Sequence, residues 1–180
     1  MGANRQLFID ADNNTTTGFI DFAWNDAGFE YIGWFWLEPE KGNWQFRDSD
    51  IMRYRDNNIK LFGQLGTAPE WASYLRTVKT GRTTPSYHDR YFQPLDMNDF
   101  KNYVKTVVSR YKGVIDEYFV WNEPWNPAWW GTGYKNGEYT TSQNPTADFE
   151  KLTKAARESA KAVYPEVKIS GFNSKGSGSD

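Results

Sequence analysis

Apolar positions recur with a helical period in the middle of the chain. From about Asp99 to Lys112 they follow one another at intervals of three and four residues, which predicts a helix with one apolar face. Asn98 is the expected N-cap of this helix, and Gly113 is expected to end it. Shorter helical patterns cover 19–27 and 49–57, and a longer one covers 146–163 before Pro165.

Short apolar runs lie between these helical patterns and are typical of buried strands. We expect strands at 7–9, 31–36, 59–65, 118–121 and 167–171. Trp34 and Trp36 would then project from the same face of the second strand, where core packing and a platform for a sugar ring are equally open. The alternation of strands and helices predicts an α/β fold with a parallel sheet and helical crossovers.

Two long irregular segments, 67–97 and 124–145, each follow a predicted strand and precede a predicted helix. In parallel α/β folds such segments lie at the carboxyl ends of the strands, where active sites are found. The connections from helix to strand, such as 113–117, are short. We therefore expect the functional residues on the face that carries the two long segments.

Glu123 comes just before the second long segment, directly after a predicted strand. A carboxyl group at this place is partly shielded from water, which suits proton donation to a leaving glycosidic oxygen. Asn122 can orient a sugar hydroxyl, and four tryptophans surround the pair, namely Trp121, Trp125, Trp129 and Trp130. From these residues alone, a catalytic and a structural role for Glu123 are equally open.

The aromatic content makes carbohydrate the first ligand class to consider. The chain has 9 Trp, 11 Tyr and 12 Phe, together 18% of its residues, although it is hydrophilic on average. A hydrophilic protein with this many rings can display some of them at its surface, where flat rings pair with sugars. Any single ring is still more often part of the core.

Charge and composition exclude several classes of protein. The net charge is -2 and the basic residues are scattered, so the chain lacks the footprint of a nucleic-acid binder. No apolar run approaches the roughly 18 residues of a membrane-spanning helix. With no cysteine and a single histidine, a thiolate or multi-histidine metal site is excluded, and we expect no cofactor.

One acidic turn has the spacing of a calcium loop. Asp10, Asp12 and Asn14 alternate with other residues, as the first oxygen ligands of such a loop do. The turn lacks the glycine at the sixth position and the glutamate at the twelfth. A solvated turn is therefore the better interpretation.

Five segments of the chain, taken in order, resemble clan A glycoside hydrolases. They are GFEYI at 28–32, WLEPEKGNWQF at 36–46, GQLGTAPEWA at 63–72, RYKG at 110–113 and WNEP at 121–124. The similarity is to the xylosidase-like family 39 and its relatives, and it covers about 19–173. Asn-Glu-Pro alone is a weak motif, whereas the ordered set is a strong one.

This resemblance implies a TIM barrel and a retaining mechanism. The glutamate that matches Glu123 protonates the leaving oxygen and later deprotonates water, and the asparagine that matches Asn122 contacts the sugar 2-hydroxyl. The nucleophile is a second glutamate at the end of the seventh strand, about 5–5.5 Å from the first. Gln64 and Trp71 match positions that line the cleft. Apart from the resemblance, further candidate substrate contacts are Trp36, Trp121, Trp125 and Trp129, and also His88, for which a hydrogen-bonded surface histidine is the better interpretation.

By the same resemblance, residues 1–180 form a single incomplete catalytic domain. They correspond to about five βα units of a barrel that has eight, preceded by a polar segment at 1–18 and followed by a linker-like tail at 174–180. We expect the nucleophile to lie outside this chain, and relatives carry an arginine near the second strand where this chain reads Tyr31–Trp34. The open barrel is expected to self-associate or to require a missing C-terminal half.

Two functions are therefore weighed. The first is hydrolysis of β-linked poly- or oligosaccharides; on this hypothesis the isolated chain is expected to be inactive. The alternative is a non-catalytic carbohydrate-binding protein that keeps a tryptophan-lined cleft. The substrate class favours a secreted or periplasmic location, although no targeting segment follows Met1.

Overall fold

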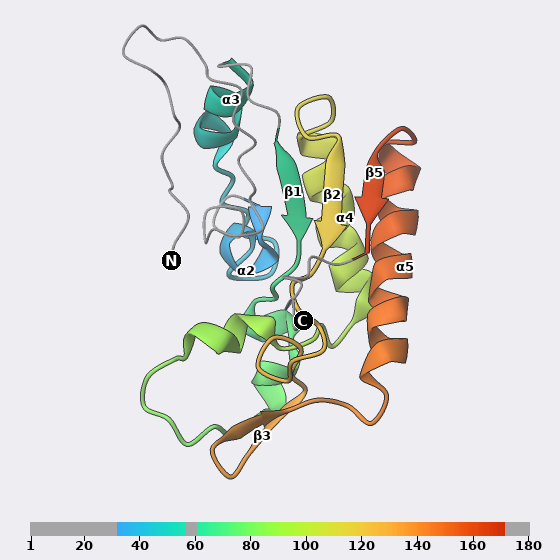
Figure 1. Ribbon diagram of the computed structural model, residues 1–180. Helices are drawn as coiled ribbons and strands as arrows, with labels where there is room; N and C mark the ends of the chain where they lie inside the picture. The colour runs from blue at the N-terminus through green and yellow to red at the C-terminus, as the bar shows by residue number, and fades with distance from the viewer. Residues whose placement is uncertain (1–31, 57–60, 172–180) are drawn as a thin grey trace, which may run out of the picture.

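The computed structural model describes residues 32–56 and 61–171, and these contain a parallel sheet with helices packed against it (Figure 1). Strands β1 (Phe62–Leu65), β2 (Glu117–Val120) and β5 (Lys168–Ser170) form the sheet in the order β1-β2-β5. Both pairings are parallel, with Phe62 opposite Glu117 and Glu117 opposite Lys168. The predicted α/β fold is thereby confirmed for this part of the chain. The predictions at 7–9 and 19–27 and the acidic turn at Asp10–Asn14 lie outside the described residues.

Three longer helices follow the predicted pattern. They are α3 (Asp48–Asp56), α4 (Met97–Arg110) and α5 (Pro145–Val163). Helix α4 begins two residues before the expected start, because the Asp96 side chain accepts a hydrogen bond from the Asn98 backbone N–H at 2.7 Å. Asp96 and not Asn98 is therefore the N-cap. Asn144 caps α5 by accepting a hydrogen bond from the Ala147 N–H at 3.3 Å.

The core lies between the sheet and helices α4 and α5, which contact each other. In Figure 1, α4 passes behind β2 and α5 runs beside β5. The apolar stripe of α4 is buried as its period predicts, and Leu152, Ala156 and Ala160 bury the matching face of α5. Small alanines on α5 let the two helices approach closely.

The expected strand at 31–36 is wrong, because residues Trp34–Leu37 form the short helix α2. The Trp34 indole N–H donates to the Glu38 carboxylate at 2.7 Å, one helical turn away, and its ring stacks on Tyr103 of α4 at 5.3 Å. Trp34 is fully buried, whereas Trp36 keeps 36% of its surface exposed. The two rings thus do not share a face. A short run of apolar residues is compatible with both the helical and the strand period, so tertiary contacts determine which of the two forms here.

Both long irregular segments contain local structure. The first holds three short 3-10 helices, η2 (Glu70–Ala72), η3 (Tyr74–Thr77) and η4 (Tyr87–Tyr91). The second holds a hairpin of strands β3 (Gly133–Lys135) and β4 (Glu138–Thr140). Asn136 and Gly137 form its turn with φ of 54° and 86°, a pair of positive angles that Asn-Gly adopts readily. In Figure 1 these segments gather beyond the carboxyl ends of the strands.

Candidate functional site

The exits of β1 and β2 carry backbone conformations that are uncommon for residues other than glycine. Thr67 follows β1 with φ of 57°, and Trp121 and Glu123 follow β2 with φ of 63° and 45°. Sparsely populated conformations of this kind cluster at functional sites, where surrounding structure holds them in place. The backbone N–H of Trp121 donates to the Leu65 carbonyl at 2.9 Å, so the two exits lie side by side.

Glu123 lies at the exit of β2, the central strand, and is half-buried. Its backbone carbonyl accepts a hydrogen bond from the Asn126 N–H at 3.1 Å, which closes a turn. Among the described residues, none donates a hydrogen bond to its carboxylate or pairs with it. Asn122, next to it, is also half-buried. The backbone turn thus sets the position of Glu123, and no side chain of the described residues occupies its carboxylate.

The four tryptophans of this region divide into two kinds. Trp121 and Trp130 are fully buried and pack edge to face at 4.9 Å between ring centres. The Trp121 indole donates to the Trp129 carbonyl, and the Trp130 indole donates to the Pro145 carbonyl at the start of α5 at 3.2 Å. By contrast, Trp125 is 54% exposed and Trp129 is half-buried. The buried pair therefore supports the turn that carries Glu123 and the rings that reach the surface.

Gln64 and Trp71 lie in β1 and in η2 just beyond it. Gln64 is fully buried, and its amide has no hydrogen-bond partner within the described residues. Trp71 is half-buried, and its indole donates to the Glu38 carbonyl at 2.9 Å. The ring of Trp71 meets that of Trp34 edge to face at 5.6 Å. These contacts attach η2 to the segment that follows α2.

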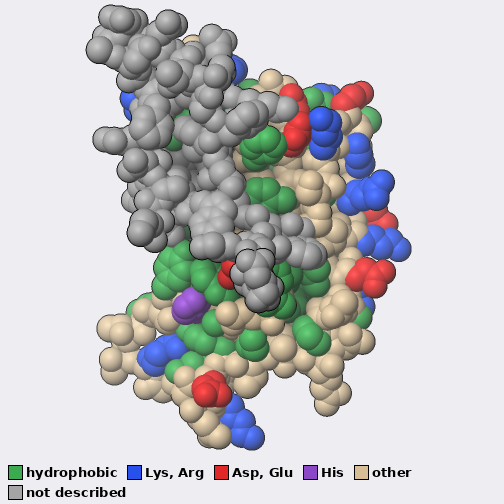
Figure 2. Space-filling model, in the orientation of Figure 1, with side chains coloured by type: hydrophobic (Ala, Val, Ile, Leu, Met, Phe, Trp, Pro, Cys, Tyr) green, Lys and Arg blue, Asp and Glu red, His purple; other side chains and the backbone are tan. Residues whose placement is uncertain are grey.

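His88 joins the two long segments. Its ring lies edge to face with Trp129 at 5.0 Å and with Tyr139 of β4 at 5.6 Å. Burial is the main influence on the imidazole and lowers its pKa, against the opposing effects of the Ala128 backbone and the Asp89 charge. The neutral form is therefore favoured near neutral pH. Figure 2 shows hydrophobic side chains gathered around this histidine on the visible face.

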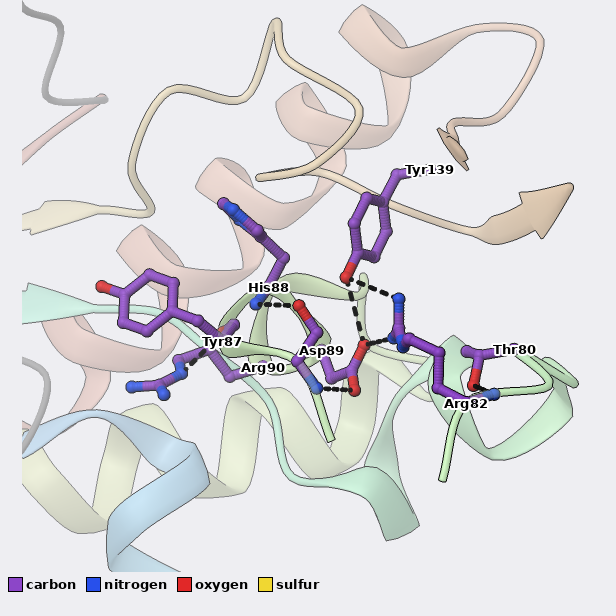
Figure 3. Close-up of polar contacts among 8 residues, drawn as sticks. Thr80, Arg82, Tyr87, His88, Asp89, Arg90 and Tyr139 are labelled. Atoms are coloured by element: carbon purple, nitrogen blue, oxygen red, sulfur yellow. Dashed lines mark hydrogen bonds and ion pairs between the residues drawn. The ribbon is translucent and has the colours of Figure 1, made fainter. Parts of the chain in front are cut away.

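A second set of residues that the sequence did not single out lies next to His88 (Figure 3). Asp89 forms an ion pair with Arg82 and accepts the Ser86 backbone N–H at 2.7 Å. Arg82 also donates to the Tyr139 hydroxyl at 3.1 Å. The first long segment is thus bound to the hairpin of the second. The spacing Ser86-x-x-Asp89 is a capping-box pattern and is the one sequence signal for this set.

The backbone also ties the two long segments together. Phe92 and Gly131 form a parallel bridge, in which the Gln93 N–H donates to the Gly131 carbonyl at 2.8 Å. The half-buried His88 and Trp125 lie in these two connected segments, whereas Trp36 belongs to α2.

No group of three or more potential metal ligands occurs within 32–56 and 61–171. Nor is any helix in those ranges long and apolar enough to cross a membrane.

No family model and no curated protein matches the chain. Solved structures similar to it include a psychrophilic family 10 endo-β-1,4-xylanase, at 22% identity and a TM-score of 0.47, over 77% of this chain and 41% of that one. Xylanase 10B from Thermotoga petrophila RKU-1 matches at 23% identity and a TM-score of 0.47, over 77% and 37%. A family 39 glycoside hydrolase from Bacteroides cellulosilyticus WH2 matches at 16% identity and a TM-score of 0.49, over 83% and 28%.

The chain is thus similar in structure to glycoside hydrolases of families 10 and 39. It spans less than half the length of each of these structures.

Proposed function

We propose that the protein is a retaining glycoside hydrolase that cleaves β-linked poly- or oligosaccharides, with Glu123 as the general acid/base. The observation that carries this proposal is the placement of Glu123. A half-buried carboxylate with no partner among the described residues lies at the exit of the central parallel strand, on a backbone with φ of 45°. Active sites of parallel α/β folds lie at this end of the sheet.

In the first step, the protonated Glu123 donates its proton to the glycosidic oxygen as the bond between that oxygen and the anomeric carbon breaks. A second carboxylate attacks the anomeric carbon and forms a glycosyl ester. In the second step, Glu123 removes a proton from water, the water oxygen bonds to the anomeric carbon, and the ester breaks. Asn122 donates to the sugar 2-hydroxyl, where charge redistribution strengthens the hydrogen bond in the transition state.

The second carboxylate belongs to the same proposal. A retaining pair is separated by about 5–5.5 Å. We place the nucleophile on the seventh strand of a TIM barrel of which this chain supplies about five βα units. The isolated chain is therefore expected to bind substrate without turning it over, and a polysaccharide substrate makes export part of the proposal.

Side chains that reach the surface near the strand exits offer contacts to sugar. Trp125 is 54% exposed and Trp36 is 36% exposed, so each can present a ring face to a pyranose. Trp71, Trp129 and His88 are half-buried, so each can offer only part of its ring to a sugar. For Gln64 and Trp121, which are fully buried, the role that fits is support of the residues that touch the sugar.

The acid/base role can be tested without turnover. An analogue whose glycosidic oxygen is replaced by N–H carries a proton at the position that Glu123 faces, so an ionised carboxylate binds it in preference to the natural sugar. Calorimetry should compare cello-, xylo- and mannotetraose with these analogues. The best-bound analogue is expected to bind at least about tenfold more tightly than its parent. Glu123→Gln should reduce that ratio to about one.

Glu138→Gln is the matched control, because Glu138 is an exposed glutamate of β4 in the same segment. It should leave the ratio unchanged. Equal binding of analogue and parent by the unaltered chain contradicts the acid/base role. Turnover of aryl β-glycosides by the chain, abolished in Glu123→Gln, would show instead that the chain supplies its own nucleophile.

A non-catalytic carbohydrate-binding protein is the second candidate. The exposure of Trp125 favours it, because a ring at the surface suffices to hold a sugar. This candidate predicts that tetrasaccharides bind and that Trp125→Ala weakens them, whereas replacing the glycosidic oxygen by N–H has no effect that depends on Glu123.

A further inference from the structure

Arg90 is the basic side chain of η4 that lies among aromatic rings at the exit of β1. Its guanidinium carbon is 4.1 Å from the ring centre of Tyr87, 5.0 Å from that of Trp36 and 5.4 Å from that of Phe35. Two of these rings, Trp36 and Tyr87, keep 36% and 40% of their surface exposed. The arginine is itself partly exposed.

The N–H groups of Arg90 are largely unused. Its Nε donates to the Tyr87 carbonyl at 2.9 Å, and no carboxylate of the described residues pairs with the guanidinium. The nearby Asp89 is turned toward Arg82 on the other side of η4, as Figure 3 shows. The Glu38 carboxylate is occupied by the Trp34 indole and by the Gly42 N–H at 2.7 Å.

Ring contacts and anion binding use different parts of a guanidinium. Aromatic rings cover its faces, whereas its N–H donors point outward in its plane and match the two oxygens of a carboxylate. Rings also exclude water, so the attraction between an anion and a cation among rings is stronger than the attraction between the same charges in bulk solvent. The N–H donors of Arg90 are therefore placed to bind a planar anionic group that lies beside the exposed rings.

The position of Arg90 connects it with the proposed site. Its carbonyl accepts the Ala68 N–H at 2.8 Å, and the Phe35 N–H donates to the Thr67 hydroxyl at 3.3 Å. Both contacts are made to the residues that follow β1. The exit of β1 is joined to that of β2 by the 2.9 Å hydrogen bond between Trp121 and Leu65. Arg90 and Glu123 thus belong to neighbouring strand exits of one sheet.

A hollow lies beside Trp36, one of the three rings around Arg90. It has a volume of about 460 Å³ and is lined by Trp36, Gln45, Phe46 and Arg47. Hollows of roughly 300–1,000 Å³ hold small ligands in proteins. Its aromatic faces and the Gln45 amide suit contact with a sugar ring.

We propose that Arg90, with Trp36 and Tyr87, forms a subsite for the carboxylate of a uronic acid, so that the substrate is an acidic β-linked saccharide. This rests on the proposed function for the rest of the sugar chain. The guanidinium N–H groups donate to the two carboxylate oxygens, and an exposed ring contacts the pyranose that bears them. Neutral saccharides lack the group that this arginine recognises.

The test compares methyl β-glucuronide with its methyl ester, which has nearly the same shape and no charge. Nuclear magnetic resonance of the full 180-residue chain, labelled with ¹⁵N, gives both dissociation constants and the shift of the Arg90 Nε–H signal. The acid is expected to bind at least about tenfold more tightly than the ester and to move that signal. Added salt should reduce the difference in affinity between the acid and the ester, because it screens the charge interaction.

Variants assign the preference to Arg90. Arg90→Gln should make the acid bind as weakly as the ester, and Arg90→Lys, which keeps the charge without the planar fork, should retain only part of the preference. Arg76→Gln is the matched control, because Arg76 is an exposed arginine of η3 in the same segment. It should change neither constant.

The outcomes separate this subsite from the proposed function. Equal affinities of acid and ester in the unaltered chain overturn the subsite, whether or not the variants fold. If the preference for N–H analogues of neutral tetrasaccharides persists in that case, the acid/base proposal stands. A preference for the acid that survives in Arg90→Gln overturns the assignment to this residue, and absence of binding by every saccharide overturns both proposals.

Discussion

Arg82 and Asp89 form an ion pair in which the aspartate side chain keeps 10% of its surface exposed and the arginine 24% (Figure 3). The guanidinium lies over the Tyr134 ring at 4.6 Å and donates to the Tyr139 hydroxyl. Because Tyr134 and Tyr139 belong to the β3–β4 hairpin, the Arg82 side chain that Asp89 holds joins the first long segment to the second. The loops that flank Glu123 are therefore not independent.

Asp89→Ala is expected to lower the free energy of unfolding by about 2–3 kcal/mol, since it takes the carboxylate away from a shielded guanidinium and removes the hydrogen bond that Asp89 accepts from the Ser86 N–H at the start of η4. Urea denaturation measures this loss, and hydrogen exchange should show faster opening of the hairpin. Asp56→Ala provides the control, because the Arg55–Asp56 pair is 51% and 61% exposed. That change should cost less than about 0.5 kcal/mol. Equal losses in the two variants would contradict the locking role.

A second ion pair makes stability depend on pH. The hydrogen bond from Arg110 at the end of α4 is the main cause that lowers the pKa of Asp48 at the start of α3 below its ordinary value of 3.8. Because the pKa is lower in the folded state, folding favours the ionised carboxylate. The resulting stability is present at neutral pH and is lost as the pH falls through the folded-state value, below about 4.

Arg110→Gln should therefore destabilise the protein near neutral pH and do so less in acid. A part of the loss is independent of pH, because Arg110 also lies over the Phe46 ring at 3.9 Å. Urea midpoints of the unaltered protein and of the variant, measured across the acidic range, give the difference. Asp48→Asn removes the titrating group and should flatten the dependence. If the difference in stability between the unaltered protein and Arg110→Gln stays constant with pH, the Arg110–Asp48 ion pair is not the source of the pH dependence.

The sequence predicts the repetitive parts of this fold well. Helices α3, α4 and α5 and the three parallel strands were expected within a few residues, because their apolar periods are long or their ends carry Gly and Pro. The helix at Trp34–Leu37 was missed because a run of apolar residues fits either period. There, the contacts of Trp34 with Glu38 and Tyr103 determine the outcome.

The candidate site was predictable only in its centre. Glu123 could be placed at a strand exit from the pattern of one strand and the loop after it. The hairpin carries an Asn136-Gly137 turn signal, which its short strands of three residues each do not reinforce. Contacts between distant loop residues, such as Arg82 with Tyr139, leave no periodic trace. Nor did the number of tryptophans reveal that Trp121 and Trp130 would be buried and Trp125 exposed.

Gly63 of β1 lies opposite Tyr118 of β2, and the tyrosine ring occupies the place of its missing side chain. A Cβ at Gly63 would lie 2.2 Å from a ring carbon of Tyr118. Gly63→Ala should thus destabilise the protein by more than about 2 kcal/mol, because a buried ring between sheet and helix has nowhere to move. Urea denaturation measures the change. At Gly171, where no atom of the described part of the chain lies within 4 Å of an added Cβ, alanine should have little effect.

Rescue identifies the cause of the loss at Gly63. Gly63→Ala combined with Tyr118→Leu should be more stable than the sum of the two single changes predicts, because the smaller side chain makes room for the new methyl group. Additive losses would mean that the alanine acts through the backbone instead.

Self-association is expected from the outer strand β5 of the sheet. Within the described residues, β1 and β5 flank β2, and β5 pairs with β2 alone. An outer strand presents unpaired N–H and C=O groups to any further strand, and a barrel removes such edges by closing. Sedimentation equilibrium of the 180-residue chain should therefore give a mass that rises with concentration above that of one 20.9 kDa chain. A concentration-independent monomer with one sharp thermal transition would mean that residues of this chain already cover the edges, and the need for a further barrel half would then fall away.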